Sequence, residues 1–105
     1  MIKPGVACAK VHDAVQAFFD KEGYETVRES ENLKGFFHAL GTGVGLEIHE
    51  TPIMRSASPL KFRKGMVVNG EPGLCYHGLG GVRIEEMVDV VPGGCELIYR
   101  APYKW

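Results

Sequence analysis

The sequence predicts an α+β fold, in which one long helix is followed by an antiparallel sheet. Apolar residues recur at helical spacing near the N-terminus, and beyond residue 35 short apolar or alternating segments are separated by glycine and proline. The chain has 105 residues and a mass of 11.5 kDa, which is the size of one domain. We therefore expect residues 1–105 to form a single domain.

Residues 4–22 form the predicted helix. Pro4 suits a first helical position, where its missing N–H leaves no hydrogen bond unmade, and Gly23 is a natural stop after the last turn. One apolar face, expected to pack in the core, carries Val11, Ala14, Val15, Phe18 and Phe19. The other faces carry polar side chains: His12, Asp13, Gln16, Asp20 and Lys21.

The sheet is expected to come from four segments. These are an irregular, glycine-containing strand within residues 36–48, residues 66–68, residues 82–88 with a period of two, and residues 97–99. The polar residues 28–34 and the basic, proline-containing residues 52–64 are predicted to be loops. Turns are predicted at Glu71-Pro72-Gly73 and at Pro92-Gly93-Gly94.

Composition excludes several classes of protein. Twelve Lys and Arg against thirteen Asp and Glu give a net charge of −1, which does not suit a nucleic-acid-binding surface. No apolar run approaches the ~20 residues that span a bilayer, and the N-terminus does not resemble a signal peptide. The cysteines Cys8, Cys75 and Cys95 are odd in number and form no C-x-x-C motif, so we expect free thiols and a cytoplasmic protein.

Four residues are candidates for chemistry: His38, His49, Glu71 and Glu85. Imidazole and carboxylate groups together are ligands of Zn, Mn, Fe or Co. The spacing is not a local metal motif, and each residue has an ordinary alternative: a structural histidine, an acid in a turn, or a surface glutamate paired with Arg83. The alternating glycines at 41, 43 and 45 fit a close backbone approach at a site or tight turns in a β-rich domain.

Three motifs, in order, resemble the pita-bread metallopeptidases, which include methionine aminopeptidase, aminopeptidase P, Xaa-Pro dipeptidase (prolidase) and creatinase. They are HALGTGVGLEIHETP at residues 38–52, GMVVNGEPGL at residues 65–74 and GGVRIEE at residues 80–86. Residues 2–6 resemble the start of the long helix in the second half of the family's catalytic domain. The GLEIHE stretch favours the Xaa-Pro peptidases over methionine aminopeptidase. The resemblance covers nearly the whole chain and implies half of a pita-bread fold, with a curved sheet.

The resemblance also implies roles. The family binds two divalent metals (Mn, Co or Zn) with two Asp, one His and two Glu. Glu71 matches the glutamate that binds one metal and acts as general base, and Glu85 matches the glutamate that bridges both metals. His49 matches the histidine that hydrogen-bonds the substrate and the developing oxyanion. His38 matches an outer active-site histidine, and Arg83 a residue that pairs with the acids of the site.

The chain departs from the family pattern at the metal ligands. The metal-binding histidine of the family lies seven residues before the position of His49, where this chain has Thr42, and a hydroxyl is a poor ligand for these metals. The two aspartate ligands belong to the first half of the family's domain, and none of the three aspartates here (Asp13, Asp20 and Asp89) matches them.

Of the five ligands, only Glu71 and Glu85 remain, so no metal cofactor is expected in this chain alone. Two carboxylates without counter-ligands repel each other, and we expect at least one to be protonated or neutralised by Arg83 or a stray ion.

The expected function follows from these departures. The chain is interpreted as a C-terminal half or fragment of a Xaa-Pro dipeptidase- or aminopeptidase-like metallopeptidase, whose family acts on peptides, and as inactive alone. The alternatives are a non-catalytic half-domain that binds a peptide or protein, and a small dimer with an inert site. The apolar sheet face of Val67, Val82, Ile84 and Val88 is expected to be buried in a homodimer or against a missing N-terminal half.

Overall fold

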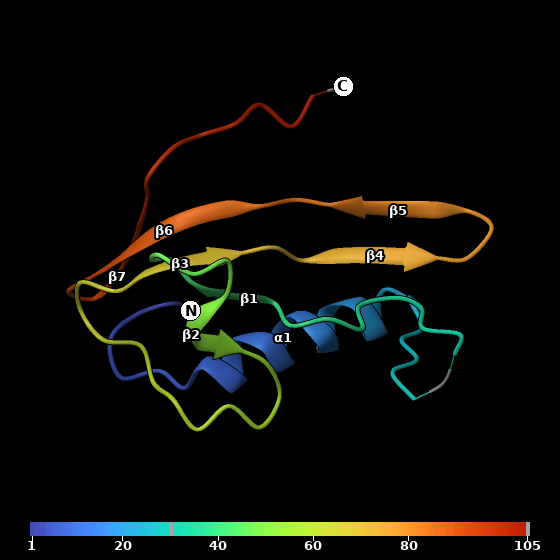
Figure 1. The fold of residues 1–105 in the computed structure, drawn as a ribbon, viewed down its shortest axis with the longest axis horizontal. Helices are drawn as coiled ribbons and strands as arrows, with labels where there is room; N and C mark the ends of the chain where they lie inside the picture. The colour runs from blue at the N-terminus through green and yellow to red at the C-terminus, as the bar shows by residue number, and fades with distance from the viewer. Residues whose placement is uncertain (30, 105) are drawn as a thin grey trace.

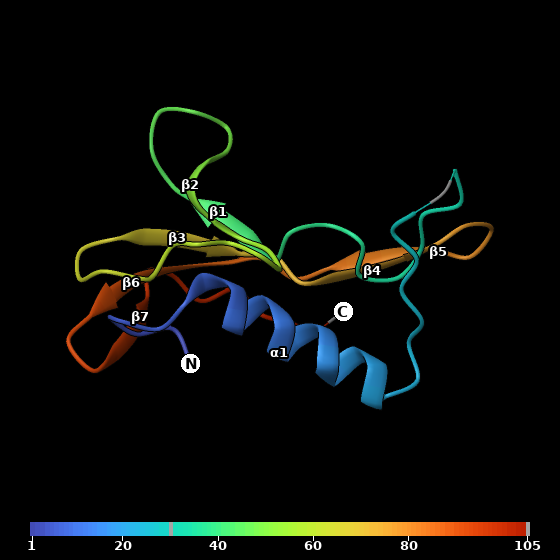
Figure 2. The same cartoon turned by 90° about the horizontal axis from the view of Figure 1, so that it is seen from below.

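The structure, a computed structural model, describes residues 1–29 and 31–104. It has the predicted α+β architecture, with one helix, α1 (Cys8–Lys21), followed by antiparallel strands (Figure 1). α1 runs along one face of the sheets, and the loop between β1 and β2 projects from the opposite face (Figure 2). In the described part of the chain, no helix is long and apolar enough to cross a membrane.

The strands form two sheets. Five of them pair in the order β2-β1-β3-β6-β7, all antiparallel: β1 (Gly41–Gly43), β2 (Glu50–Met54), β3 (Val67–Gly70), β6 (Glu86–Val91) and β7 (Gly94–Leu97). The other two, β4 (Gly73–Tyr76) and β5 (Gly80–Arg83), pair into a two-stranded ribbon. Because β4 continues the line of β3 and β5 leads into β6, the ribbon extends the larger sheet at one end (Figure 1).

The helix is shorter than the predicted residues 4–22. Its expected first turn instead pairs with a distant segment, since the Gly5 N–H donates to the Phe62 carbonyl at 2.9 Å and the Cys8 N–H donates to the Leu60 carbonyl at 2.9 Å. Gly23 ends the helix as predicted, with a φ of +87° and an N–H that donates to the Asp20 carbonyl. The first residue of the helix is thus set by hydrogen bonds to residues 60–62, whereas its end is set locally by the glycine that follows it.

The buried face of the helix differs from the predicted one. Cys8 and Val11 are buried, and Val15 and Phe19 pack beside them, but Phe18 is 58% exposed. His12, predicted to lie on a polar face, is only 3% exposed. The buried stripe is therefore rotated toward residue 12, because the histidine ring stacks on Phe36 with centroids 5.0 Å apart.

The loop predicted for residues 52–64 was wrong in part, and the irregular strand predicted within residues 36–48 was confirmed over three residues. Residues 52–64 were predicted to be a loop, but β2 reaches into them and includes Pro52, which an edge strand can accommodate. Within residues 36–48, only β1 is a strand.

The predicted strand over residues 82–88 is interrupted at Ile84 and Glu85, where the Ile84 N–H donates to the Pro72 carbonyl at 3.1 Å. Glu71-Pro72 correspondingly separates β3 from β4 and does not reverse the chain. The turn at Pro92-Gly93 is confirmed, and the last strand, β7, begins and ends earlier than predicted.

The core lies between α1 and the larger sheet. Its buried members are Cys8, Val11, Phe36, Leu40, Met54, Phe62, Val68, Val88 and Val90. The apolar sheet face predicted from sequence divides: Val88 is buried and Val67 half-buried within the chain, whereas Val82 is 53% and Ile84 39% exposed. The packed part of the molecule is thus the five-stranded sheet with its helix, and the ribbon keeps apolar side chains in solvent.

Candidate functional site

One cavity of about 320 Å³, which we call the site pocket, brings together nearly all of the residues singled out from the sequence. It is lined by His38, Ala39, Thr42, His49, Ile53, Glu71 and Arg83. These residues come from β1, β2, the end of β3, the end of β5 and the segments beside them. Of the predicted site residues, only Glu85 does not line the pocket.

Thr42 lines the site pocket from the middle of β1 and is 8% exposed. A Cβ on Gly41 would lie 1.7 Å from the Asn69 carbonyl oxygen on β3, and a Cβ on Gly43 would lie 2.2 Å from the Thr51 carbonyl oxygen on β2. The two glycines therefore permit a close approach of three backbones, the first of the two explanations offered for them. Thr42, between the two glycines, lines the site pocket.

Glu71 is held by an arginine, as expected. Arg83 Nη1 donates to Glu71 Oε2 at 3.1 Å, and the Glu71 side chain is only 17% exposed. The Glu71 backbone N–H donates to the Leu40 carbonyl at 2.6 Å, which fixes the acid beside β1. The ion pair neutralises the one carboxylate that lines the pocket.

Glu85 is exposed, and its partner is Asn69, not Arg83 as the surface-pair alternative had it. Asn69 Nδ2 donates to Glu85 Oε1 at 2.6 Å, while Asn69 Oδ1 is buried and has no partner in the described part of the chain. Sequence reasoning missed Asn69. The signal was its position two residues before Glu71, on the same face of a period-two strand.

The two histidines of the site pocket, His38 and His49, differ in burial and in hydrogen bonding. His38 Nδ1 lies 2.7 Å from the Ala39 carbonyl oxygen, and because a carbonyl only accepts, Nδ1 carries the proton. His38 Nε2 is buried and has no partner among the described residues. His49 is exposed and reaches the pocket from the end of the β1–β2 loop, next to Ile48, which is 88% exposed.

The donors present do not fit a dimetal centre. Among residues 1–29 and 31–104, no group of three or more His, Cys, Asp or Glu side chains could hold a metal ion. Glu71 is paired with Arg83 and Glu85 with Asn69, and the position of the family's imidazole ligand holds Thr42. A Thr hydroxyl and one neutralised carboxylate are a weak donor set for Mn, Co or Zn.

Two groups with shifted pKa values lie outside the site pocket. Burial raises the pKa of the Cys8 thiol above its usual value of 9.0. A hydrogen bond to Glu86 raises the pKa of Tyr103 to about 12. Neither group lies where it could act on a molecule in the pocket.

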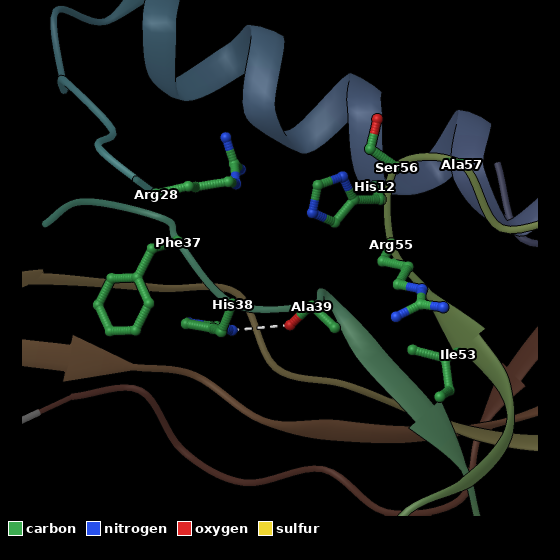
Figure 3. A pocket seen from close by; sticks show the side chains of 9 residues that line it. All are labelled: His12, Arg28, Phe37, His38, Ala39, Ile53, Arg55, Ser56 and Ala57. Carbon is green, nitrogen blue, oxygen red and sulfur yellow. Dashed lines mark hydrogen bonds between the residues drawn. The ribbon is translucent and has the colours of Figure 1, made fainter. Parts of the chain in front are cut away.

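A second cavity, of about 510 Å³, shares the wall of His38, Ala39 and Ile53 with the site pocket (Figure 3). We call it the basic pocket, and its remaining lining residues are His12, Arg28, Phe37, Arg55, Ser56 and Ala57. None of these remaining residues was singled out from the sequence: His12 lies on a predicted polar helix face, Phe37 in a predicted strand, and the others in predicted loops.

Comparison with known proteins places the chain in a family. Residues 1–92 match the family model described as metallopeptidase family M24. A Xaa-Pro dipeptidase of Pyrococcus furiosus is 35% identical over 94 residues, which make up 90% of this chain and 25% of that protein. A putative dipeptidase of Bacillus subtilis is 34% identical over 100 residues, which are 95% of this chain and 25% of that protein.

Solved structures agree. The prolidase from Pyrococcus furiosus matches with a TM-score of 0.81 at 33% identity, and the matched region is 95% of this chain and 27% of the prolidase chain. The Xaa-Pro dipeptidase from Bacillus anthracis matches with a TM-score of 0.83 at 35% identity, and the matched region is 98% of this chain and 27% of the dipeptidase chain. The chain thus spans about a quarter of the length of the curated relatives it matches. On these matches, the chain belongs to metallopeptidase family M24.

Proposed function

We propose that this chain supplies the C-terminal half of a Xaa-Pro dipeptidase- or aminopeptidase-type catalytic domain and hydrolyses no peptide by itself. The observation that carries the proposal is the site pocket, where His38, His49, Glu71 and Arg83 converge around Thr42. Relatives named Xaa-Pro dipeptidase support the substrate class, and their greater length supports the idea that further ligands come from outside these 105 residues.

The proposed inactivity rests on the donor set. A dimetal peptidase uses its ions to acidify water and to polarise the scissile carbonyl. Here Glu71 is committed to Arg83 and Thr42 offers only a neutral hydroxyl, so the pocket retains the substrate-facing histidines without the groups that would hold the metals.

The test is hydrolysis of a Xaa-Pro dipeptide by the purified chain, with Mn, Co or Zn added in turn. The expected result is no hydrolysis above a mock purification. Turnover that Glu71→Ala abolishes and the mock preparation lacks would overturn the proposal. Activity that appears only on mixing with a polypeptide carrying the first half of an M24 catalytic domain would support it.

A peptide-binding role without catalysis is the second candidate. The buried, unpartnered His38 Nε2 favours it, because a buried acceptor without a hydrogen bond is stabilised when a ligand supplies a donor. A Xaa-Pro dipeptide added without metal should then shift the ring resonances of His38 and His49, both of which line the site pocket. Unchanged resonances at millimolar dipeptide would eliminate this candidate.

We further propose that the exposed apolar residues of the ribbon are covered by a second copy of the chain, or by the first half of a catalytic domain. Leu79 is 86%, Val82 53% and Ile84 39% exposed. Val82 lies on β5 of the ribbon, Leu79 directly before this strand and Ile84 directly after it. Clustered apolar side chains of this kind mark interfaces in soluble proteins. A stable dimer interface would bury about 2,000 Å² or more in total.

Light scattering at micromolar concentration tests this assembly. A homodimer gives a mass of about twice the 11.5 kDa of one chain. The double variant Leu79→Lys/Val82→Lys should lower the measured mass to that of a single chain. A wild-type monomer throughout the micromolar range would reject the homodimer and leave the first half of a catalytic domain as the proposed cover.

A further inference from the structure

The basic pocket carries an inference that is independent of peptide hydrolysis. We propose that it binds a small organic anion with a carboxylate or phosphate head and an apolar body. The residues that would hold the head are Arg28 and Arg55, with His12 between them. Figure 3 shows these side chains entering the pocket from three elements: the loop after α1, α1 itself and the end of β2.

The positive charge of the two arginines is not compensated locally. Arg28 Nη2 donates to the Gln16 side-chain oxygen and, at 2.7 Å, to the Phe36 carbonyl, both of which are neutral acceptors. The Arg55 side chain has no hydrogen bond or ion pair in the described part of the chain. None of the lining residues described is an Asp or a Glu. A guanidinium with free donors and no acid partner is a strong site for an oxyanion.

Two histidines, His12 and His38, add ring nitrogens to the wall of the basic pocket. The His12 side chain is 4% exposed, and its Nδ1 lies 3.3 Å from Asp13 Oδ1, a carboxylate that points to solvent and does not line the pocket. His38 Nε2 is buried and has no partner among residues 1–29 and 31–104. Because His38 Nδ1 carries the proton, Nε2 is an acceptor, and the head that suits it is a phosphate monoester that keeps one P–OH group to donate.

Most of the remaining wall is apolar. Phe37, Ile53 and Ala57 line the pocket, and its volume of about 510 Å³ is in the range of small-molecule sites. Ala57 has a φ of +61°, and the turn before it is closed by the Ser58 N–H donating to the Arg55 carbonyl at 3.1 Å.

The four histidines allow a direct test, because each reports a different place. His12 lines only the basic pocket, His49 only the site pocket and His38 both, while the exposed His77 lines neither. Phenyl phosphate and phenylacetate should be titrated separately into metal-free protein while the histidine ring resonances are followed by NMR. The expected result is that His12 and His38 shift with saturation, and that His49 and His77 do not.

Three variants make the test specific. Arg55→Ala should weaken binding at least tenfold, about 1.4 kcal/mol, and Arg28→Lys, which keeps the charge but loses the planar fork, should weaken it measurably. Arg63→Ala removes the same charge from an exposed position outside both pockets and should change nothing. Circular dichroism establishes that each variant is folded.

The two probes distinguish the sources of the anion. Tighter binding of phenyl phosphate identifies a phosphate monoester, and tighter binding of phenylacetate identifies a carboxylate. Saturation by neither probe, or equal losses in Arg55→Ala and Arg63→Ala, overturns the proposal. If neither anion saturates His12 but a Xaa-Pro dipeptide shifts His49, the anion proposal fails while the peptidase proposal stands.

Discussion

The site pocket and the basic pocket share one wall but differ in origin and charge. The site pocket is built mainly on strands, and its single acid, Glu71, is paired with its single arginine, Arg83. The basic pocket is built on a helix, a loop and a turn, and its two arginines have no acidic partner within it. The comparison shows that the family motifs specify the first pocket, and that residues outside those motifs give the second its charge.

The largest effect on both pockets is expected from a substitution of Phe36, the core residue that contacts a histidine of each. Phe36 is fully buried, and its ring contacts His12 at 5.0 Å and His38 at 5.1 Å between centroids. Phe36→Ala should lower the free energy of unfolding by about 3–5 kcal/mol, through lost burial and a cavity. Urea denaturation followed by circular dichroism measures the loss.

Phe18→Ala is the matched control, because the same ring on α1 is 58% exposed. It should change stability by less than about 1 kcal/mol. Equal losses in the two variants would mean that Phe36 does not support the two pockets.

A smaller effect, confined to one pocket, is expected at β1. Gly43→Ala places a Cβ 2.2 Å from the Thr51 carbonyl oxygen, so β1 and β2 must separate. The cost should be about 1–3 kcal/mol, and the His49 resonance should move more than that of His12. Gly94→Ala on β7 meets nothing within 4 Å and should leave stability nearly unchanged. A neutral Gly43→Ala would contradict the close packing of these strands.

The smallest effect is a gain of function in the site pocket. Thr42→His places an imidazole in the cavity that Glu71 lines, and should raise the affinity for Zn or Co by about tenfold, or about 1.4 kcal/mol. Titration calorimetry measures the gain. Adding Glu71→Gln should remove it. A gain that survives Glu71→Gln would show that the new histidine binds metal elsewhere, and that the two positions do not share one site.

The parts of the molecule that could be predicted are those with local causes. Gly23 ends the helix, Pro92-Gly93 turns the chain, and the motif residues other than Glu85 line one pocket. The rest depended on contacts across the sequence. The helix begins late because Gly5 pairs with Phe62, and His12 is buried because Phe36 lies against it. Nothing in the local sequence signals either contact.

The basic pocket was not predicted for the same reason. His12, Arg28 and Arg55 lie in three separate segments, and each alone is typical of a solvated surface. Only the path of the chain around Phe36 and β2 brings them to one cavity. Asn69 is different, because its position two residues before Glu71 was visible in the sequence.

The interruption at Glu71-Pro72 and Ile84-Glu85 has a practical consequence for labelling the protein. It separates the ribbon from the five-stranded sheet, and the ribbon ends in an exposed turn around Gly78, whose φ is +78°. A fluorophore or short tag inserted at this tip would lie at the far end of the molecule from β7 (Figure 1). Exposed tips of this kind tolerate insertion, so the tip offers an attachment point for surface immobilisation that leaves both cavities open.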